Sequence, residues 1–262
     1  MHARRSQPRF DVVNDRHLLR IGAVAALMGA AAQLVATILE VDAGSDPAKA
    51  IRTVATSGFW NGDRLLDLIG VFLTVGALTV LGRTFAEGPA REWSRVGQPF
   101  LMLMGALGAG AVFASANLKE IADAWAASAP HARQSYLAAF DAAQQRPDDL
   151  FFGAFMALGL YLATLAAAIL VGGLYSRRLG WTAAAGAVLV LAGDLLELLV
   201  DAAFVAVLAG FVLFLVVLVA LGASMWRAAA PHLHLGDVTN TRHAALMPRL
   251  ERETLQRKEY ER

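Results

Sequence analysis

Residues Leu179–Trp226 read LGWTAAAGAVLVLAGDLLELLVDAAFVAVLAGFVLFLVVLVALGASMW, an apolar stretch interrupted only by Asp194, Glu197 and Asp201. As a single helix at 1.5 Å per residue it would be about 70 Å long, more than twice the roughly 30 Å hydrocarbon core of a membrane. The stretch therefore has to fold back on itself, and the acids mark the predicted reversal. We predict two membrane spans here, near 179–197 and 203–226.

Four further apolar runs lie near 18–40, 65–86, 96–118 and 150–175. Each is close to the roughly 20 residues that cross a bilayer as a helix with every backbone N–H and C=O paired internally. The composition agrees, because 57% hydrophobic and 17% charged residues are too apolar for a soluble domain of this size. The sequence thus predicts an all-α, multi-pass membrane helix bundle with six spans in residues 18–227.

The basic residues predict the orientation of this bundle. With six spans, 17 of the 23 Lys and Arg residues fall on the side that carries the N-tail (1–17) and the C-tail (228–262). Because cytoplasmic segments retain basic residues, we expect a basic N-tail and a polar C-tail that are both cytoplasmic, in a bacterial plasma (inner) membrane. The tryptophans then fall at membrane boundaries, which are outer for Trp60 and Trp125 and inner for Trp93, Trp181 and Trp226.

Two outer loops carry helix signals of their own. Asp46 followed by Pro47 predicts the start of one helix, with Gly58 as its stop. Ser128 before Pro130 predicts a second, which carries Tyr136, Leu137 and Phe140. We expect both to be short interfacial helices over the outer ends of the bundle; the alternative is a lid over a binding cavity.

Acidic residues gather on the side opposite to the bases, where 13 of the 22 Asp and Glu residues fall. This excess gives the outer mouth a cation-attracting potential. Asp194, Glu197 and Asp201 are spaced by three and four residues, which predicts one stripe along a helix. Carboxylates inside a membrane often line a cavity on an ion or proton path; the alternative is a water-exposed apex of the last hairpin. The candidate ion or proton site comprises Asp67, Glu120, Asp194, Glu197 and Asp201.

Other charged residues have structural explanations. Asp63, Asp148 and Asp149 are expected at helix starts, where a carboxylate caps free N–H groups and meets the positive end of the helix dipole. Two further pairs are spaced to interact along one helix face, Arg64 with Asp67 and Lys119 with Asp123.

No catalytic, cofactor-binding or metal-binding motif is present in the sequence. There is no cysteine, no phosphate-binding Walker loop, no H-E-x-x-H and no G-x-S-x-G. None of the six histidines falls in the middle of a predicted span. We therefore predict no cofactor, and a net charge of +1 argues against a nucleic acid as partner.

Short motifs in the second half of the chain resemble a family. They are Phe151-Phe152-Gly153, the segment from Leu174 to Trp181, Leu191-Ala192-Gly193, and Gly222 to Arg227. Together with Gly62-Asp63, they are similar in layout to bacterial six-span membrane proteins grouped as a domain of unknown function. The short connection between the last two spans departs from that family. The resemblance implies a membrane bundle and no particular activity.

These observations leave three functional hypotheses. The first is a non-enzymatic membrane protein that works by helix packing or by binding other membrane proteins or itself within the lipid bilayer. The alternative is a proton- or cation-coupled transporter with an acidic outer vestibule. The third is a membrane enzyme that uses two of the carboxylates as acid and base, which requires a defined separation between them.

Overall fold

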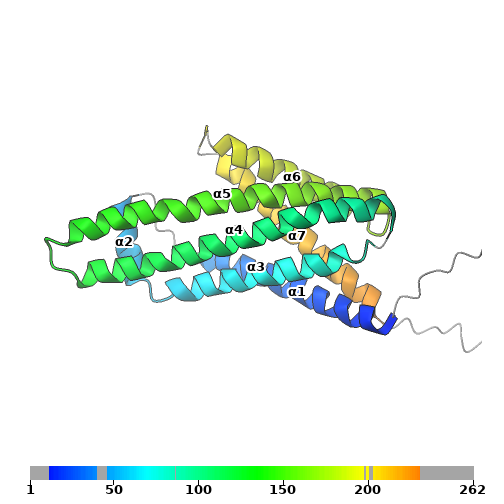
Figure 1. The fold of residues 1–262 in the computed structure, drawn as a ribbon, viewed down its shortest axis with the longest axis horizontal. Helices are drawn as coiled ribbons and strands as arrows, with labels where there is room; N and C mark the ends of the chain where they lie inside the picture. Colours follow the sequence, from blue (N-terminus) through cyan, green and yellow to red (C-terminus); the bar gives the residue numbers. More distant parts are fainter. Residues whose placement is uncertain (1–11, 40–45, 86, 198, 201–202, 231–262) are drawn as a thin grey trace, which may run out of the picture. The chain divides into compact units, whose positions relative to one another are not determined.

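The computed structural model describes residues 12–39, 46–85, 87–197, 199–200 and 203–230. Within these ranges the chain forms seven α-helices (Figure 1): α1 Val12–Leu39, α2 Pro47–Thr56, α3 Trp60–Gly82, α4 Gly88–Ala127, α5 Arg133–Gly172, α6 Arg177–Glu197 and α7 Phe204–Ala229. Six of these helices, all except α2, are long and apolar enough to span a membrane. The predicted all-α, multi-pass architecture is confirmed, whereas most of both predicted tails lies outside the described residues.

Each of the six helices that could span a membrane contains or overlaps one of the six predicted spans. The last reversal also falls where the acids predicted it, because α6 ends at Glu197 and α7 begins at Phe204. Spanning helices that follow one another in the chain pack side by side, and α7 also packs against α1, so the contacts close into a ring of six helices. The shared core includes Leu78, Leu101, Leu162, Phe214 and Leu218.

Helices α4 and α5 are much longer than a membrane crossing requires. Each has 40 residues, which corresponds to about 60 Å of helix, whereas a crossing takes about 20 residues. The last part of α4 and the first part of α5 form a helical hairpin that turns between Ala127 and Arg133. The prediction of a separate short helix in this loop is wrong, because the residues after Pro130 begin α5 itself.

A proline, Pro147, lies inside α5. A proline inside a helix removes one backbone hydrogen bond and costs about 3 kcal/mol or more. The helix nevertheless continues through it, since α5 packs against α4 along the hairpin and Pro147 itself is buried. Asp148 and Asp149 consequently lie inside α5, so the prediction that they cap a helix start is wrong.

The other predicted short helix is α2, and its signals are confirmed. The Asp46 Oδ1 atom accepts a hydrogen bond of 3.0 Å from the Ala48 backbone N–H, and Pro47 occupies the first helical position. The buried face of α2 carries Ala50, Ile51 and Val54. This helix packs against α4 and α5 (Figure 1). We define the hairpin module as α2, the first turn of α3, residues 115–127 of α4 and residues 133–149 of α5.

Candidate functional site

The acids near the last reversal do not share one environment. Asp194 is buried, with 1% of its surface exposed, whereas Glu197, one turn later, is exposed. Asp201 lies outside the described residues. Burial therefore separates the two acids: Asp194 lies inside the helix bundle and Glu197 on its surface.

Asp194 lies beside a close approach of α6 to α7. A Cβ atom placed on its neighbour Gly193 would lie 2.8 Å from the Val207 backbone nitrogen. Within the described part of the chain, the Oδ2 atom of Asp194 is buried and has no hydrogen-bond partner. A buried polar atom without a partner reduces the stability of the fold by roughly 1–3 kcal/mol, so the burial of this carboxyl group is locally destabilising.

Asp67 and Glu120 lie away from Asp194. Asp67 is half-buried on α3, which packs mainly against α1 and α4, whereas α6 packs against α5 and α7. Asp67 takes part in an interaction within the described chain. Glu120 is exposed on the hairpin part of α4. The structure thus places four of the five predicted site acids on three helices.

The hairpin module has an apolar core of its own. It contains Ala50, Ile51, Val54, Trp60, Leu118, Ala122 and Phe140. The Trp60 side chain is 3% exposed, and its Nε1 atom donates a hydrogen bond of 3.0 Å to the Ser115 carbonyl. The start of α3 is therefore fixed to α4 by packing and by a satisfied polar contact.

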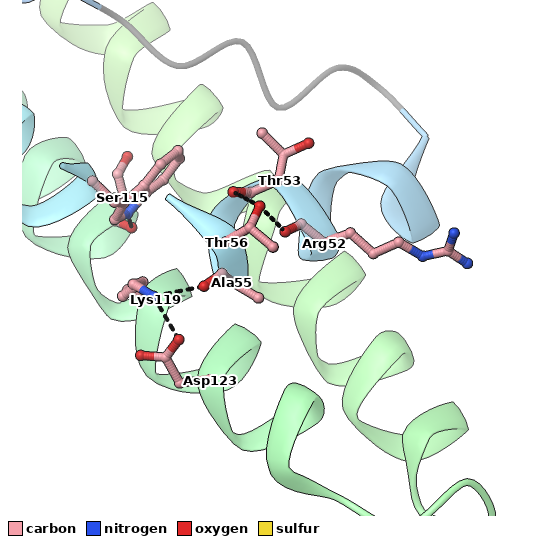
Figure 2. Close-up of polar contacts among 8 residues, drawn as sticks. Arg52, Thr53, Ala55, Thr56, Ser115, Lys119 and Asp123 are labelled. Carbon is pink, nitrogen blue, oxygen red and sulfur yellow. Dashed lines mark hydrogen bonds and ion pairs between the residues drawn. The ribbon is translucent and has the colours of Figure 1, made fainter. Parts of the chain in front are cut away.

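Lys119 connects the end of α2 to α4 (Figure 2). Its Nζ atom donates a hydrogen bond of 3.0 Å to the Ala55 carbonyl, in the last turn of α2, and lies 2.5 Å from Asp123 Oδ1. A cation at the C-terminal end of a helix is stabilised by the helix dipole. The predicted ion pair of Lys119 with Asp123 is confirmed, and the same lysine also holds α2 in place.

Asp63 and Arg64 form a buried ion pair at the start of α3. The Arg64 Nη2 and Asp63 Oδ2 atoms are 3.6 Å apart, and the Arg64 guanidinium lies 4.6 Å from the centre of the Trp60 ring. Asp63 is in the first helical turn as predicted, but neither carboxylate oxygen makes a hydrogen bond within the described residues. The prediction that Asp63 caps the helix is therefore wrong.

A cavity of about 840 Å³, which the sequence did not predict, lies at the opposite end of the ring from the hairpin. Arg83, Arg178 and Arg227 contribute to its lining from α6 and from the ends of α3 and α7. In the sequence these arginines served only to orient the spans. One sequence feature could have pointed to this cavity: a hydroxyl residue lies within three positions of each arginine. These residues are Thr84, Ser176 and Ser224.

Comparisons of this chain with protein-family models, curated proteins and solved structures found no match.

Proposed function

We propose that the protein is a non-enzymatic integral protein of the bacterial plasma membrane that works by binding another membrane protein or a second copy of itself. The observation that carries this proposal is the hairpin module. Residues that do not contribute to a membrane crossing are packed there around a separate apolar core, with a buried ion pair and a lysine that ties α2 to α4.

The surface of the module around the α4–α5 turn suits a helical partner. Its exposed residues include Ala126, Ala127, Ala129, Ala138, Ala139 and Ala142. Small side chains allow the backbone of another helix to approach closely, and alanine loses no side-chain conformational entropy when it is covered. The rigid interior and the small exposed side chains together favour a contact surface over a catalytic site.

The contact can be tested by crosslinking in native membranes, because the chain has no cysteine of its own. A photo-crosslinker attached to an Ala138→Cys variant should give one discrete protein adduct. Adding Ala142→Arg, one turn away on the same helix, should remove that adduct by placing a bulky charge in the contact. Val188→Cys is the matched control, since Val188 is 64% exposed on the apolar α6 and should label lipid only. Recovery of monomer alone from the Ala138→Cys variant would argue against the proposal.

The proposed orientation places both tails in the cytoplasm and the hairpin module outside. We expect an Ala127→Cys variant to react with a membrane-impermeant maleimide in intact cells. A Glu92→Cys variant, at the start of α4, should react only after the cells are opened. Both positions are exposed on the surface of the protein. A difference in labelling between them therefore reports the side of the bilayer on which each one lies. The reverse labelling pattern would invert the topology.

A second candidate function, a proton- or cation-coupled transporter, is favoured by the buried carboxyl group of Asp194. If it carries the coupling, Asp194→Asn should abolish proton-coupled flux in proteoliposomes, because the amide cannot bind and release a proton. Glu197→Gln, which neutralises an exposed acid on the same helix, should leave the flux unchanged. Equal flux in the wild type and the Asp194→Asn variant would exclude this candidate.

A further inference from the structure

The arginine cavity brings together the ends of helices that are far apart in the sequence. Its walls come from the first part of α1, the end of α3, the start of α6 and the end of α7, and the connection between α5 and α6 completes them. Its volume of about 840 Å³ lies within the usual range for small-molecule sites, roughly 300–1,000 Å³.

The charge in this cavity is of one sign only. Arg83, Arg178 and Arg227 line it, whereas its described lining contains no Asp or Glu. Within the described chain, Arg95 and Lys119 elsewhere on α4 have acidic partners, but no carboxylate forms an ion pair with the three cavity arginines. The Nε atom of Arg227 donates to the Ala223 carbonyl at 3.3 Å. Each guanidinium has five N–H donors, so most of them remain available to a ligand.

The position of Arg178 adds to the excess positive potential. Arg83 and Arg227 lie at the C-terminal ends of their helices, where the helix dipole stabilises a cation. Arg178 is the second residue of α6, at the N-terminal end, where the dipole disfavours a cation and favours an anion. A bound anion would therefore be stabilised by both the Arg178 side chain and the positive end of the α6 dipole.

A fixed hydroxyl pair borders the cavity. The Thr84 Oγ1 atom donates to the Leu81 carbonyl at 2.7 Å and also forms a hydrogen bond of 3.1 Å with the Tyr175 hydroxyl. Burial raises the pKa of the Tyr175 phenol, and the hydrogen bond with Thr84 acts in the opposite direction. The Tyr175 ring also packs against Phe85, with ring centres 5.8 Å apart. The connection before α6 is therefore anchored to the end of α3.

The remainder of the lining is apolar. It includes Leu18, Leu19, Val80, Leu179 and Met225. Next to the lining, Trp181 and Trp226 are 67% and 51% exposed, as is typical of aromatic residues at the level of lipid headgroups. A fully hydrated anion would leave these apolar walls uncovered, whereas the chain of a lipid would cover them.

We propose that this cavity binds a phosphate-bearing amphiphile, namely an anionic membrane lipid. The phosphate accepts charge-assisted hydrogen bonds from the arginines, and the hydrocarbon chain lies along the leucine, valine and methionine side chains. The site is independent of the contact surface on the hairpin module. The same phosphate chemistry in a water-soluble anion would satisfy only the polar half of the cavity.

The test measures retention of individual lipids by the full chain in a neutral detergent, with native mass spectrometry as the readout. The probes are phosphatidylglycerol, phosphatidylcholine and inorganic phosphate. We expect the wild type to retain phosphatidylglycerol, and Arg83→Gln/Arg178→Gln to weaken its binding at least about tenfold through the loss of charge-assisted hydrogen bonds. Arg91→Gln/Arg95→Gln is the matched control, because it removes the same charge from the exposed start of α4 at the same end. This control should bind like the wild type.

A second variant keeps the arginines and fills the space. Ser224→Trp places a large side chain in the lining and should also displace phosphatidylglycerol, which separates binding in the cavity from general attraction to basic residues. Equal retention by the wild type and both cavity variants would overturn the site. Displacement of phosphatidylglycerol by inorganic phosphate at equal concentration would overturn the assignment to a lipid, and equal retention of phosphatidylcholine would overturn the requirement for an anion.

Discussion

Gly210→Ala is expected to destabilise the folded bundle by roughly 3 kcal/mol, the scale of overpacking in a rigid core. A Cβ atom at Gly210 would lie 2.9 Å from the Val190 nitrogen and 3.0 Å from the Gly186 carbonyl oxygen. Both atoms belong to the backbone of α6, so neither can move unless the whole helix does. Separation of α6 from α7 would also expose Asp194. The measurement is thermal unfolding in detergent, followed by the loss of the monodisperse peak in size-exclusion chromatography.

Gly76→Ala is the matched control for this experiment. Gly76 is an exposed residue inside the spanning helix α3, and nothing lies within 4 Å of a Cβ atom built there. Alanine is intrinsically a better helix former than glycine, by up to about 1 kcal/mol. The control should therefore unfold at the same temperature as the wild type or slightly above it. If both variants lost the same stability, backbone contact between α6 and α7 would not be the cause.

Trp60→Ala is expected to detach α2 and the start of α3 from the hairpin module, at a cost of roughly 3–5 kcal/mol. The indole is the largest side chain in the core of the module. Its removal would leave a cavity, free the Ser115 carbonyl from its hydrogen bond and expose the face of Arg64 that now lies over the ring. The loss should be local, because the core of the six-helix ring is a separate cluster.

Hydrogen exchange can separate this local loss from global unfolding. In the Trp60→Ala variant, backbone amides of residues 47–56 should exchange much faster, whereas those in the middle of α5 and α7 should remain protected. Trp181→Ala removes the same side chain from a position where it is 67% exposed and should leave both regions protected. Protection of α2 in both variants would show that Trp60 does not hold the module together.

The six spans could be predicted because each depends on a local requirement. A helix in lipid satisfies its backbone within its own segment, so the length and polarity of that segment are sufficient to locate it. The start of α2 was equally local, since Asp46 and Pro47 act on the first turn that follows them. The resemblance to a six-span family stays a prediction.

The features that the sequence did not reveal depend on contacts between distant segments. Continuation of α5 through Pro147 requires the packing of α4 beside it, and no local pattern reports that contact. The different exposure of Asp194 and Glu197 follows from how α6 packs against α7, although the two acids are only three residues apart on the same helix. The arginine cavity exists only once the ends of several helices meet.

The uninterrupted course of α4 and α5 has a mechanical consequence. Pro99 lies near the start of α4 and Pro147 in the hairpin part of α5. The two positions that lack a backbone hydrogen bond therefore do not face each other, and each is supported by an uninterrupted stretch of the neighbouring helix. With no shared hinge, the pair behaves as one lever about 60 Å long. A tilt of about 10° around the cavity end would displace the far turn sideways by roughly 10 Å.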